Sequence, residues 1–254
     1  MRPRKRIGLA RALSKMGHCS RSQAAVLIRA GRVSLNKRTI TDPETPVRID
    51  PGRNPQDWTL QEKIAVDGTL LAHAPLIYLV LNKPRGVVTT ASDEKGRATV
   101  YTLLDPGLPW VGPVGRLDKA SEGLLLFTND SKWSAKIANP SSHLDKKYHV
   151  QVGCVANPDL LKKVVRGIAD GGEHLRAKSA RLLRHGDKNS WLEIILDEGK
   201  NRQIRRLLEA LNVQVLRLMR VSIGPLNLGD LKKGAVRRLT PEEKKQIDRA
   251  LGAG

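Results

Sequence analysis

Short apolar segments separated by polar turns are the feature that most restricts how this chain can fold. They recur from residue 75 onward, and none approaches the roughly 20 residues that cross a bilayer. Runs of this length are typical of strands, and helical patterns over 159–165 and 203–211 lie between them. We therefore predict an α+β fold with a mixed, mostly antiparallel sheet and no membrane partner. The predicted strands are 77–81, 87–90, 124–128, 148–152, 191–196 and 215–218.

The positive charge of the chain is concentrated at its start. Residues 1–41 contain 11 Lys or Arg and no Asp or Glu, within a chain of 45 basic and 25 acidic residues and a net charge of +20. This excess predicts a polyanionic partner, first of all a nucleic acid. Aromatic residues make up only 3% of the chain, which argues against rows of aromatics stacked on bases and favours recognition of phosphates and shape.

This basic segment has the pattern of a folded unit. Leu9, Leu13 and Met16 recur at helical spacing, and a second helix is predicted to begin at Ser20, which forms a capping box with Gln23.

The second helix should end at Gly31, after which Val33, Leu35 and Ile40 alternate as strand residues around a turn at 36–38. We therefore predict a small N-terminal helix-pair/β domain over residues 1–70. Residues 51–61 form a loop insertion within it, because they are rich in Pro, Gly and polar residues. A larger domain follows over residues 75–250.

The cysteines narrow the class of protein further. Cys19 and Cys154 are far apart and belong to no Cys/His cluster, so we predict neither a disulfide framework nor a metal site. A reducing, cytoplasmic location follows. The basic, acid-free start also admits an organellar transit peptide, although no apolar core with a cleavage site follows it.

The most informative segment is 115–130, GRLDKASEGLLLFTND. It places Arg116 and Asp118 in a loop before an apolar strand, between two glycines that permit tight turns. From the residues alone this is a candidate carboxylate site, and the alternative is a turn cap or a surface ion pair.

The same segment resembles the catalytic motif of the pseudouridine synthases, in particular the RsuA-type family that modifies ribosomal RNA. Four further segments resemble motifs of this family in the same order: 81–90, 147–152, 198–206 and 216–226. The resemblance covers nearly the whole chain and implies a catalytic domain of the pseudouridine synthase type. Ser121 stands where the family pattern has Thr or Ser, and Ser131 where many members have Gly.

Residues 20–36 are similar to a small RNA-binding domain first known in a ribosomal small-subunit protein. Such a domain presents basic residues to structured RNA, in agreement with the acid-free composition found here. The alternative is a basic face that only contacts solvent. The expected phosphate contacts are Arg11, Arg21, Arg29, Arg32 and Lys37.

The family resemblance also implies a mechanism and its residues. Asp118 matches the catalytic aspartate, which either attacks the ribose or removes a sugar proton. The resemblance pairs it with Arg205, and a guanidinium lowers the pKa of a neighbouring carboxyl group by about one to three units. Tyr148 matches the tyrosine that packs on the flipped uracil. The isomerisation needs no redox equivalent and no added group, so no cofactor is expected.

Further basic residues are expected to hold RNA around this site. Arg116 is assigned to RNA binding or loop positioning, and Lys200, Arg202 and Arg206 to phosphates beside the flipped nucleotide. The basic stretch 232–249 either extends this footprint or forms a polar terminal helix. A solvated charge run is the alternative for Arg202 and Arg206.

The leading hypothesis is therefore a monomeric enzyme that isomerises uridine in ribosomal RNA, preferably of the large subunit. One alternative is a non-catalytic RNA-binding or ribosome-assembly factor that uses the same two domains; the presence of Asp118, Tyr148 and Arg205 argues against it. A second alternative, an RNA methyltransferase, requires a glycine-rich nucleoside-binding turn, and the sequence has no GxGxxG.

Overall fold

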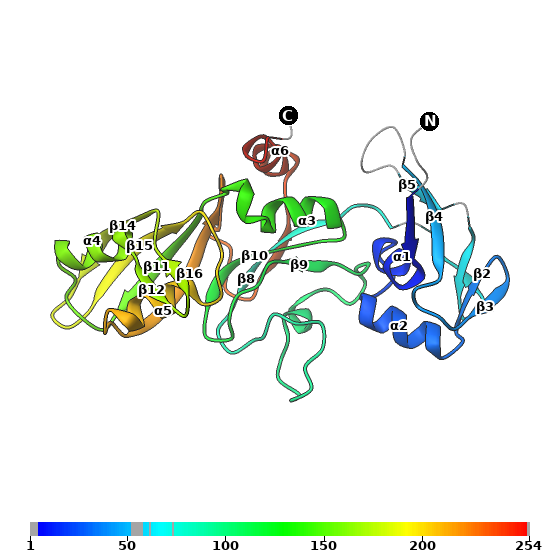
Figure 1. Ribbon diagram of the computed structural model, residues 1–254, viewed down its shortest axis with the longest axis horizontal. Helices are drawn as coiled ribbons and strands as arrows, with labels where there is room; N and C mark the ends of the chain where they lie inside the picture. Colours follow the sequence, from blue (N-terminus) through cyan, green and yellow to red (C-terminus); the bar gives the residue numbers. More distant parts are fainter. Residues whose placement is uncertain (1–4, 52–57, 61, 73, 253–254) are drawn as a thin grey trace. The chain divides into compact units, whose positions relative to one another are not determined.

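The computed structural model describes residues 5–51, 58–60, 62–72 and 74–252 (Figure 1). The chain forms two compact units. The first unit comprises the N-terminal residues up to 78 together with the short segments 105–112 and 127–131, and the second comprises the remainder.

The N-terminal unit contains the predicted pair of helices, α1 (Leu9–Lys15) and α2 (Arg21–Arg29). The capping box that starts α2 is present in full: Ser20 Oγ accepts from the Gln23 N–H at 3.1 Å, and Gln23 Oε1 accepts from the Ser20 N–H at 3.0 Å. The apolar residues at helical spacing form a buried core with the strands that follow. Local capping and hydrophobic periodicity thus suffice to position these helices.

A four-stranded sheet follows, in the order β3-β2-β6-β7. Its strands are β2 (Val33–Leu35), β3 (Arg38–Ile40), β6 (Ile64–Val66) and β7 (Thr69–Leu70). The predicted strands on either side of residue 37 are confirmed. Asn36 and Lys37 both have positive φ, as a two-residue hairpin turn requires.

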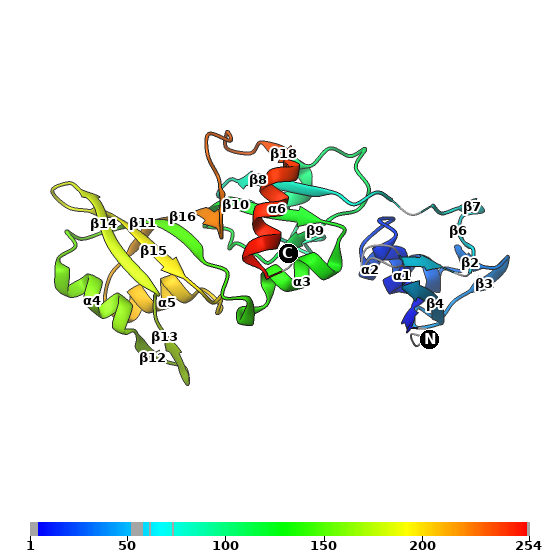
Figure 2. The same ribbon diagram turned by 90° about the horizontal axis from the view of Figure 1, so that it is seen from above.

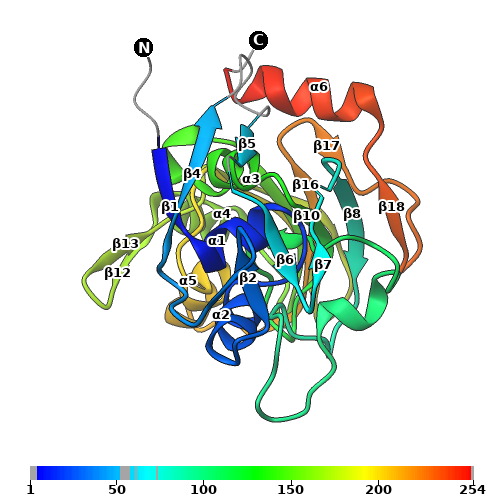
Figure 3. The same cartoon turned by 90° about the vertical axis from the view of Figure 1, so that its right-hand side faces the viewer.

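The loop predicted over 51–61 is wrong in part. A second sheet joins β1 (Lys5–Gly8), β4 (Pro46–Pro51) and β5 (Trp58–Leu60), and β5 pairs antiparallel with the end of β4 (Figure 3). Pro51 and residues 58–60 are therefore in strands; residues 52–57 and 61 lie outside the described part. Pairing with β4 satisfies backbone groups in a segment whose composition suggests a loop.

The second unit is built on a mixed sheet in the order β14-β15-β11-β16-β10-β8-β18. β10 and β16 run parallel, whereas the pairs β14–β15, β15–β11, β11–β16 and β8–β18 are antiparallel. The prediction of a mixed, mostly antiparallel sheet is confirmed. The strands along this order are β14 (Ser179–His185), β15 (Ser190–Leu196), β11 (Lys146–Val152), β16 (Val215–Ile223), β10 (Glu122–Thr128), β8 (Tyr78–Lys83) and β18 (Val236–Arg238), with β9 (Gly112–Val114) beside β10 and β17 (Leu226–Asn227) beside β16.

Both predicted helices of this unit are present, as α4 (Pro158–Arg166) and α5 (Gln203–Ala210), and they lie on one face of the strands β14, β15, β11 and β16 (Figure 2). Val150, Leu192 and Leu207 are fully buried in the core between them. A hairpin of β12 (Ile168–Asp170) and β13 (Glu173–Leu175) projects beside α5.

Several elements differ from the prediction. Residues 87–90 form no strand: only Val88 makes a bridge, to Thr99, and Thr89 Oγ1 instead donates to the Leu117 carbonyl at 2.8 Å. Helix α3 (Ser131–Ala138) was not foreseen. The basic C-terminal stretch contains α6 (Pro241–Ala250), whose Ile247 is fully buried. The described residues also include two short 3₁₀ helices, η1 (Val100–Leu103) and η2 (Pro140–Ser142).

No helix in the described part of the chain is both long enough and apolar enough to cross a membrane.

Candidate active site

Asp118 lies in the loop between β9 and β10. The Lys83 side chain holds the backbone of this loop through hydrogen bonds. The Lys83 side chain is fully buried. Its Nζ donates to three carbonyl oxygens: that of Asp118 at 3.1 Å, that of Ser121 at 2.8 Å and that of Pro84 at 3.0 Å. An ammonium with three donors matches three acceptors, so one side chain ties both ends of the turn around Asp118 to the end of β8.

Gly123 brings β10 close to the strand beside it. It has φ of +102°, and a Cβ at this position would lie 2.2 Å from the Arg220 carbonyl oxygen of β16. Only glycine therefore permits the parallel contact that sets the Asp118 loop beside β16.

Two guanidinium groups from the start of α5 face the Asp118 carboxylate. Arg202 Nη1 lies 3.6 Å and Arg205 Nε 3.9 Å from Asp118 Oδ2. Arg205 also donates from Nη2 to the Ala120 carbonyl at 3.3 Å. Arg202 has left-handed backbone angles, φ 47° and ψ 32°, which a residue other than glycine adopts at a cost. This strained turn points a second cation at the carboxylate, which was expected to face only Arg205.

A cavity of about 200 Å³ adjoins this carboxylate. Its lining includes Asp118, Ser121 and Tyr148 together with Lys146 and Arg220. Tyr148 and Arg220 are directly opposite each other on β11 and β16, so their side chains lie on the same face of the sheet. The structure thus brings the expected Asp118 and Tyr148 to one cavity.

Three polar side-chain atoms in the site are buried and have no hydrogen-bond partner among the described residues: Ser121 Oγ, Arg205 Nε and Arg220 Nη2. Sequence reasoning assigned no role in the site to Ser121, Lys146 or Arg220. The only available signal was that each lies in or beside a segment that resembles a family motif.

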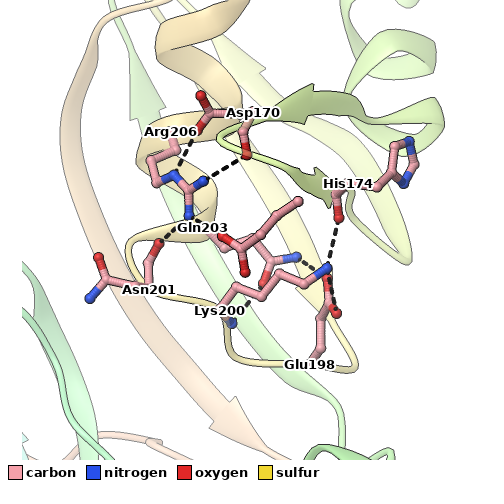
Figure 4. A network of polar contacts seen from close by, with 8 residues as sticks. Asp170, His174, Glu198, Lys200, Asn201, Gln203 and Arg206 are labelled. Atoms are coloured by element: carbon pink, nitrogen blue, oxygen red, sulfur yellow. Dashed lines mark hydrogen bonds and ion pairs between the residues drawn. The ribbon is translucent and has the colours of Figure 1, made fainter.

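Two of the expected RNA-binding cations, Arg206 and Lys200, form hydrogen bonds and ion pairs with other residues of the protein (Figure 4). Arg206 donates to Asp170 at 2.7 Å and to Glu173 at 2.6 Å, both on the β12–β13 hairpin. Lys200 donates to the His174 carbonyl at 2.7 Å and pairs with Glu198 at 3.1 Å. These bonds fasten the hairpin to α5.

The remaining expected cations lie at the surface. Arg116 is exposed and lines both the cavity beside Asp118 and a neighbouring groove that also contains Lys119 and Arg202. In the N-terminal unit the exposed side chains include Arg11, Arg21, Arg29 and Lys37.

Arg32 differs from these four, because it forms a two-bond ion pair with Asp67, with N–O distances of 2.9 and 2.5 Å. The described residues contain no group of three or more His, Cys, Asp or Glu side chains that could hold a metal ion.

Known proteins share this architecture. The chain is 35% identical over 245 residues to ribosomal large subunit pseudouridine synthase B of Bacillus subtilis (strain 168), covering 96% of each chain. It is 38% identical over 229 residues to an uncharacterized RNA pseudouridine synthase of Rickettsia prowazekii (strain Madrid E), covering 89% of this chain and 91% of the relative. A crystal structure of a pseudouridylate synthase matches with a TM-score of 0.63 and 29% identity, over 95% of this chain and 99% of the other.

Two family models match separate segments of the chain. Residues 7–52 match the S4 domain, and residues 77–210 match RNA pseudouridylate synthase. These matches agree with the resemblances inferred from the motifs. The chain therefore belongs to the RNA pseudouridylate synthase family and carries an S4 domain ahead of the synthase segment.

Proposed function

We propose that this protein converts a specific uridine of ribosomal RNA, in the large subunit, to pseudouridine, with Asp118 as the catalytic residue. The position of Asp118 supports this role. Its carboxylate adjoins a cavity, and Arg202 Nη1 and Arg205 Nε lie 3.6 and 3.9 Å from its Oδ2. The name of the Bacillus subtilis relative supports ribosomal RNA of the large subunit as the substrate.

The reaction breaks the bond between the ribose and N1 of uracil and forms a bond from the same ribose carbon to C5. The proton of C5 leaves, and N1 gains one, so the isomerisation balances without a cofactor. Asp118 either attacks the ribose or removes a sugar proton, and it acts as the anion in both cases. The guanidinium groups of Arg202 and Arg205 place positive charge beside that anion.

Tyr148 supplies the apolar surface for the flipped base, and it lines the same cavity as Asp118. The target nucleotide must leave its stack, which costs a few kcal/mol. We propose that the groove containing Arg116 and Lys119 holds the flanking phosphates and offsets this cost. Arg202 contributes to the groove and to the ion pair.

Lys200 and Arg206 act differently in this proposal. Because Arg206 is held by Asp170 and Glu173, and Lys200 by Glu198, they position α5 and its arginines more than they bind phosphate.

The proposal is tested with Asp118→Asn and, as a matched control, Asp187→Asn, which removes the same charge from an exposed turn. Ribosomal RNA labelled with tritium at uracil C5 releases tritium when pseudouridine forms. We expect Asp118→Asn to abolish release while RNA affinity stays within about twofold, and the control to react normally. Release by Asp118→Asn at the wild-type rate contradicts the assignment.

The substrate is identified by mapping pseudouridines in ribosomal RNA from cells with and without the gene. Loss of one large-subunit site is expected, and loss of a small-subunit site contradicts the preference. The monomeric state stays a prediction that light scattering can check.

We also propose that the N-terminal unit binds RNA phosphates through its exposed arginines. Arg21→Gln combined with Arg29→Gln removes two contacts, so the slope of log affinity against log salt should fall by about 1.8 on duplex RNA. Arg32→Gln should change the slope less, because Asp67 already neutralises Arg32. An unchanged slope in the double variant contradicts these contacts.

A further inference from the structure

Arg220 is a buried cation that the proposed chemistry does not use. Arg220 is only 6% exposed, and its Nε donates a hydrogen bond to the Leu124 carbonyl at 2.8 Å. Nη2 is buried and has no hydrogen-bond partner among the described residues. A guanidinium N–H that is desolvated without an acceptor costs free energy, so its presence in a cavity wall indicates that something bound there accepts from it.

Ser121, which lines the same cavity, also has a buried polar atom without a hydrogen-bond partner among the described residues. It is 1% exposed, its carbonyl oxygen accepts from Lys83 Nζ, and its N–H donates to the Asp118 carbonyl at 3.0 Å. The backbone of Ser121 is therefore fixed three residues after Asp118. Its Oγ has no partner among the described residues, although a hydroxyl both donates and accepts.

The position of Arg220 indicates which part of a nucleotide it meets. Arg220 is directly opposite Tyr148 across β11 and β16, and both line the cavity. A ring that packs flat on Tyr148 presents its edge to a side chain about 5 Å away on the next strand. Phosphates remain on the RNA strand at the mouth of the site, where Arg202, with half of its side chain exposed, is available to them.

We propose that Arg220 and Ser121 form a subsite for the edge of the uracil ring, in which Arg220 Nη2 donates to a ring carbonyl oxygen. The inference rests on the proposed function, because it requires a uridine in the cavity beside Asp118. Uracil carries two carbonyl oxygens, whereas cytosine replaces one of them, O4, with an amino group. Arginine only donates, so a subsite that engages O4 also rejects cytidine.

The test combines a change in the protein with a change in the base. RNA hairpins carry uridine, 2-thiouridine or 4-thiouridine at the target, because sulfur accepts hydrogen bonds more weakly than oxygen. We expect the wild-type enzyme to lose about 10- to 100-fold in single-turnover rate with one of the two thio bases, as for a hydrogen bond to a charged group. Arg220→Lys keeps the charge but loses Nη2, and its rates with the oxygen and sulfur bases should be nearly equal. A thio effect of full size in Arg220→Lys overturns the role of Arg220.

Ser121→Ala is the second variant, and it keeps the subsite testable if Arg220 variants fold poorly. Its hydroxyl has no partner to lose, so the melting temperature should stay unchanged while the rate falls severalfold. Ser179→Ala, exposed on β14, is the matched control and should react normally. A normal rate in Ser121→Ala removes Ser121 from the subsite.

These outcomes separate the subsite from the proposed function. Wild-type enzyme that forms no pseudouridine in any ribosomal RNA, or product formation by Asp118→Asn, contradicts the function itself. Normal wild-type turnover with an undiminished thio effect in Arg220→Lys contradicts the subsite alone.

Discussion

The buried Lys83 ammonium should make the protein more stable as the pH rises above 8. Burial lowers the pKa of Lys83 to about 8, although the carboxylates of Asp118 and Glu122 oppose this shift. An unfolded chain keeps the proton up to a pKa of 10.5. Between these values the unfolded state binds more protons, so the free energy of unfolding increases with pH. A difference of about 2.5 pKa units corresponds to about 3 kcal/mol. This free energy is an upper value, because the three hydrogen bonds from Lys83 to carbonyl oxygens favour the charged amine and oppose the lowering of its pKa.

Lys83→Met removes this titration and nearly preserves side-chain length. From pH 7 to pH 10 the unfolding free energy of the wild type should rise relative to that of the variant by up to about 3 kcal/mol. Urea denaturation followed by tryptophan fluorescence measures both proteins at each pH. Lys162→Met, which removes an exposed lysine of α4, is the control and should run parallel to the wild type. If Lys83→Met also runs parallel, the reasoning about the buried amine is refuted.

At pH 7, Lys83→Met should lower the catalytic rate strongly while changing the free energy of unfolding little. The carbonyl groups of Pro84 and Ser121 lose the donor that holds the loop, whereas the cost of burying a charge disappears. Asp118 is then free to move, and a displacement of about 1 Å can cost about 100-fold in rate. Tritium release under single-turnover conditions measures this loss, and a rate within threefold of wild type contradicts it.

Two further predictions concern β10. Gly123→Ala places a Cβ against the Arg220 carbonyl at positive φ, so it should destabilise the protein by more than about 2 kcal/mol, and an unchanged urea midpoint contradicts this. Burial alone raises the pKa of Glu122, but hydrogen bonds from Arg217 and Lys233 outweigh it and hold that pKa below its usual value. Its stabilisation is therefore present above the unfolded pKa of about 4.3 and lost as the pH falls through the lower folded value. Glu122→Gln should lose less stability than wild type in urea denaturation between pH 7 and pH 3, and equal losses contradict this.

Local signals in the sequence explain the elements that were predicted correctly. Ser20 and Gln23 are three residues apart, and a capping box needs only that spacing and a helix behind it. The apolar run at 124–127 has no polar alternation, and all of β10 proves to be buried. Such features depend on neighbours within a few residues, so the sequence displays them directly.

The elements that were missed depend on partners far along the chain. Residues 58–60 form β5 because β4 offers a free edge. Residues 87–90 have strand-forming side chains, yet the Thr89 hydroxyl bonds to the backbone of the Asp118 loop instead. Neither partner can be recognised from the segment itself.

The arginines of 202–206 show the same limit within the site. The sequence groups Arg202 and Arg206 as phosphate-binding cations, but the turn before α5 sends them in different directions. Arg202 faces Asp118 at 3.6 Å, and Arg206 is held by Asp170 and Glu173. Arg202 precedes α5 and has left-handed backbone angles, whereas Arg206 lies within the helix. No composition or spacing rule predicts this difference in backbone conformation.

Residue types at short spacing were enough to predict the fold class, the order of the motifs, the basic N-terminal unit and the family. Tertiary packing was needed to show which cations face Asp118 and that Lys83 holds the Asp118 loop. It was also needed to show that Arg220 Nη2 and Ser121 Oγ have no hydrogen-bond partner among the described residues. Burial and hydrogen bonding depend on surroundings that are assembled from distant parts of the chain. A basic or hydroxyl side chain acquires its role only when those surroundings are in place.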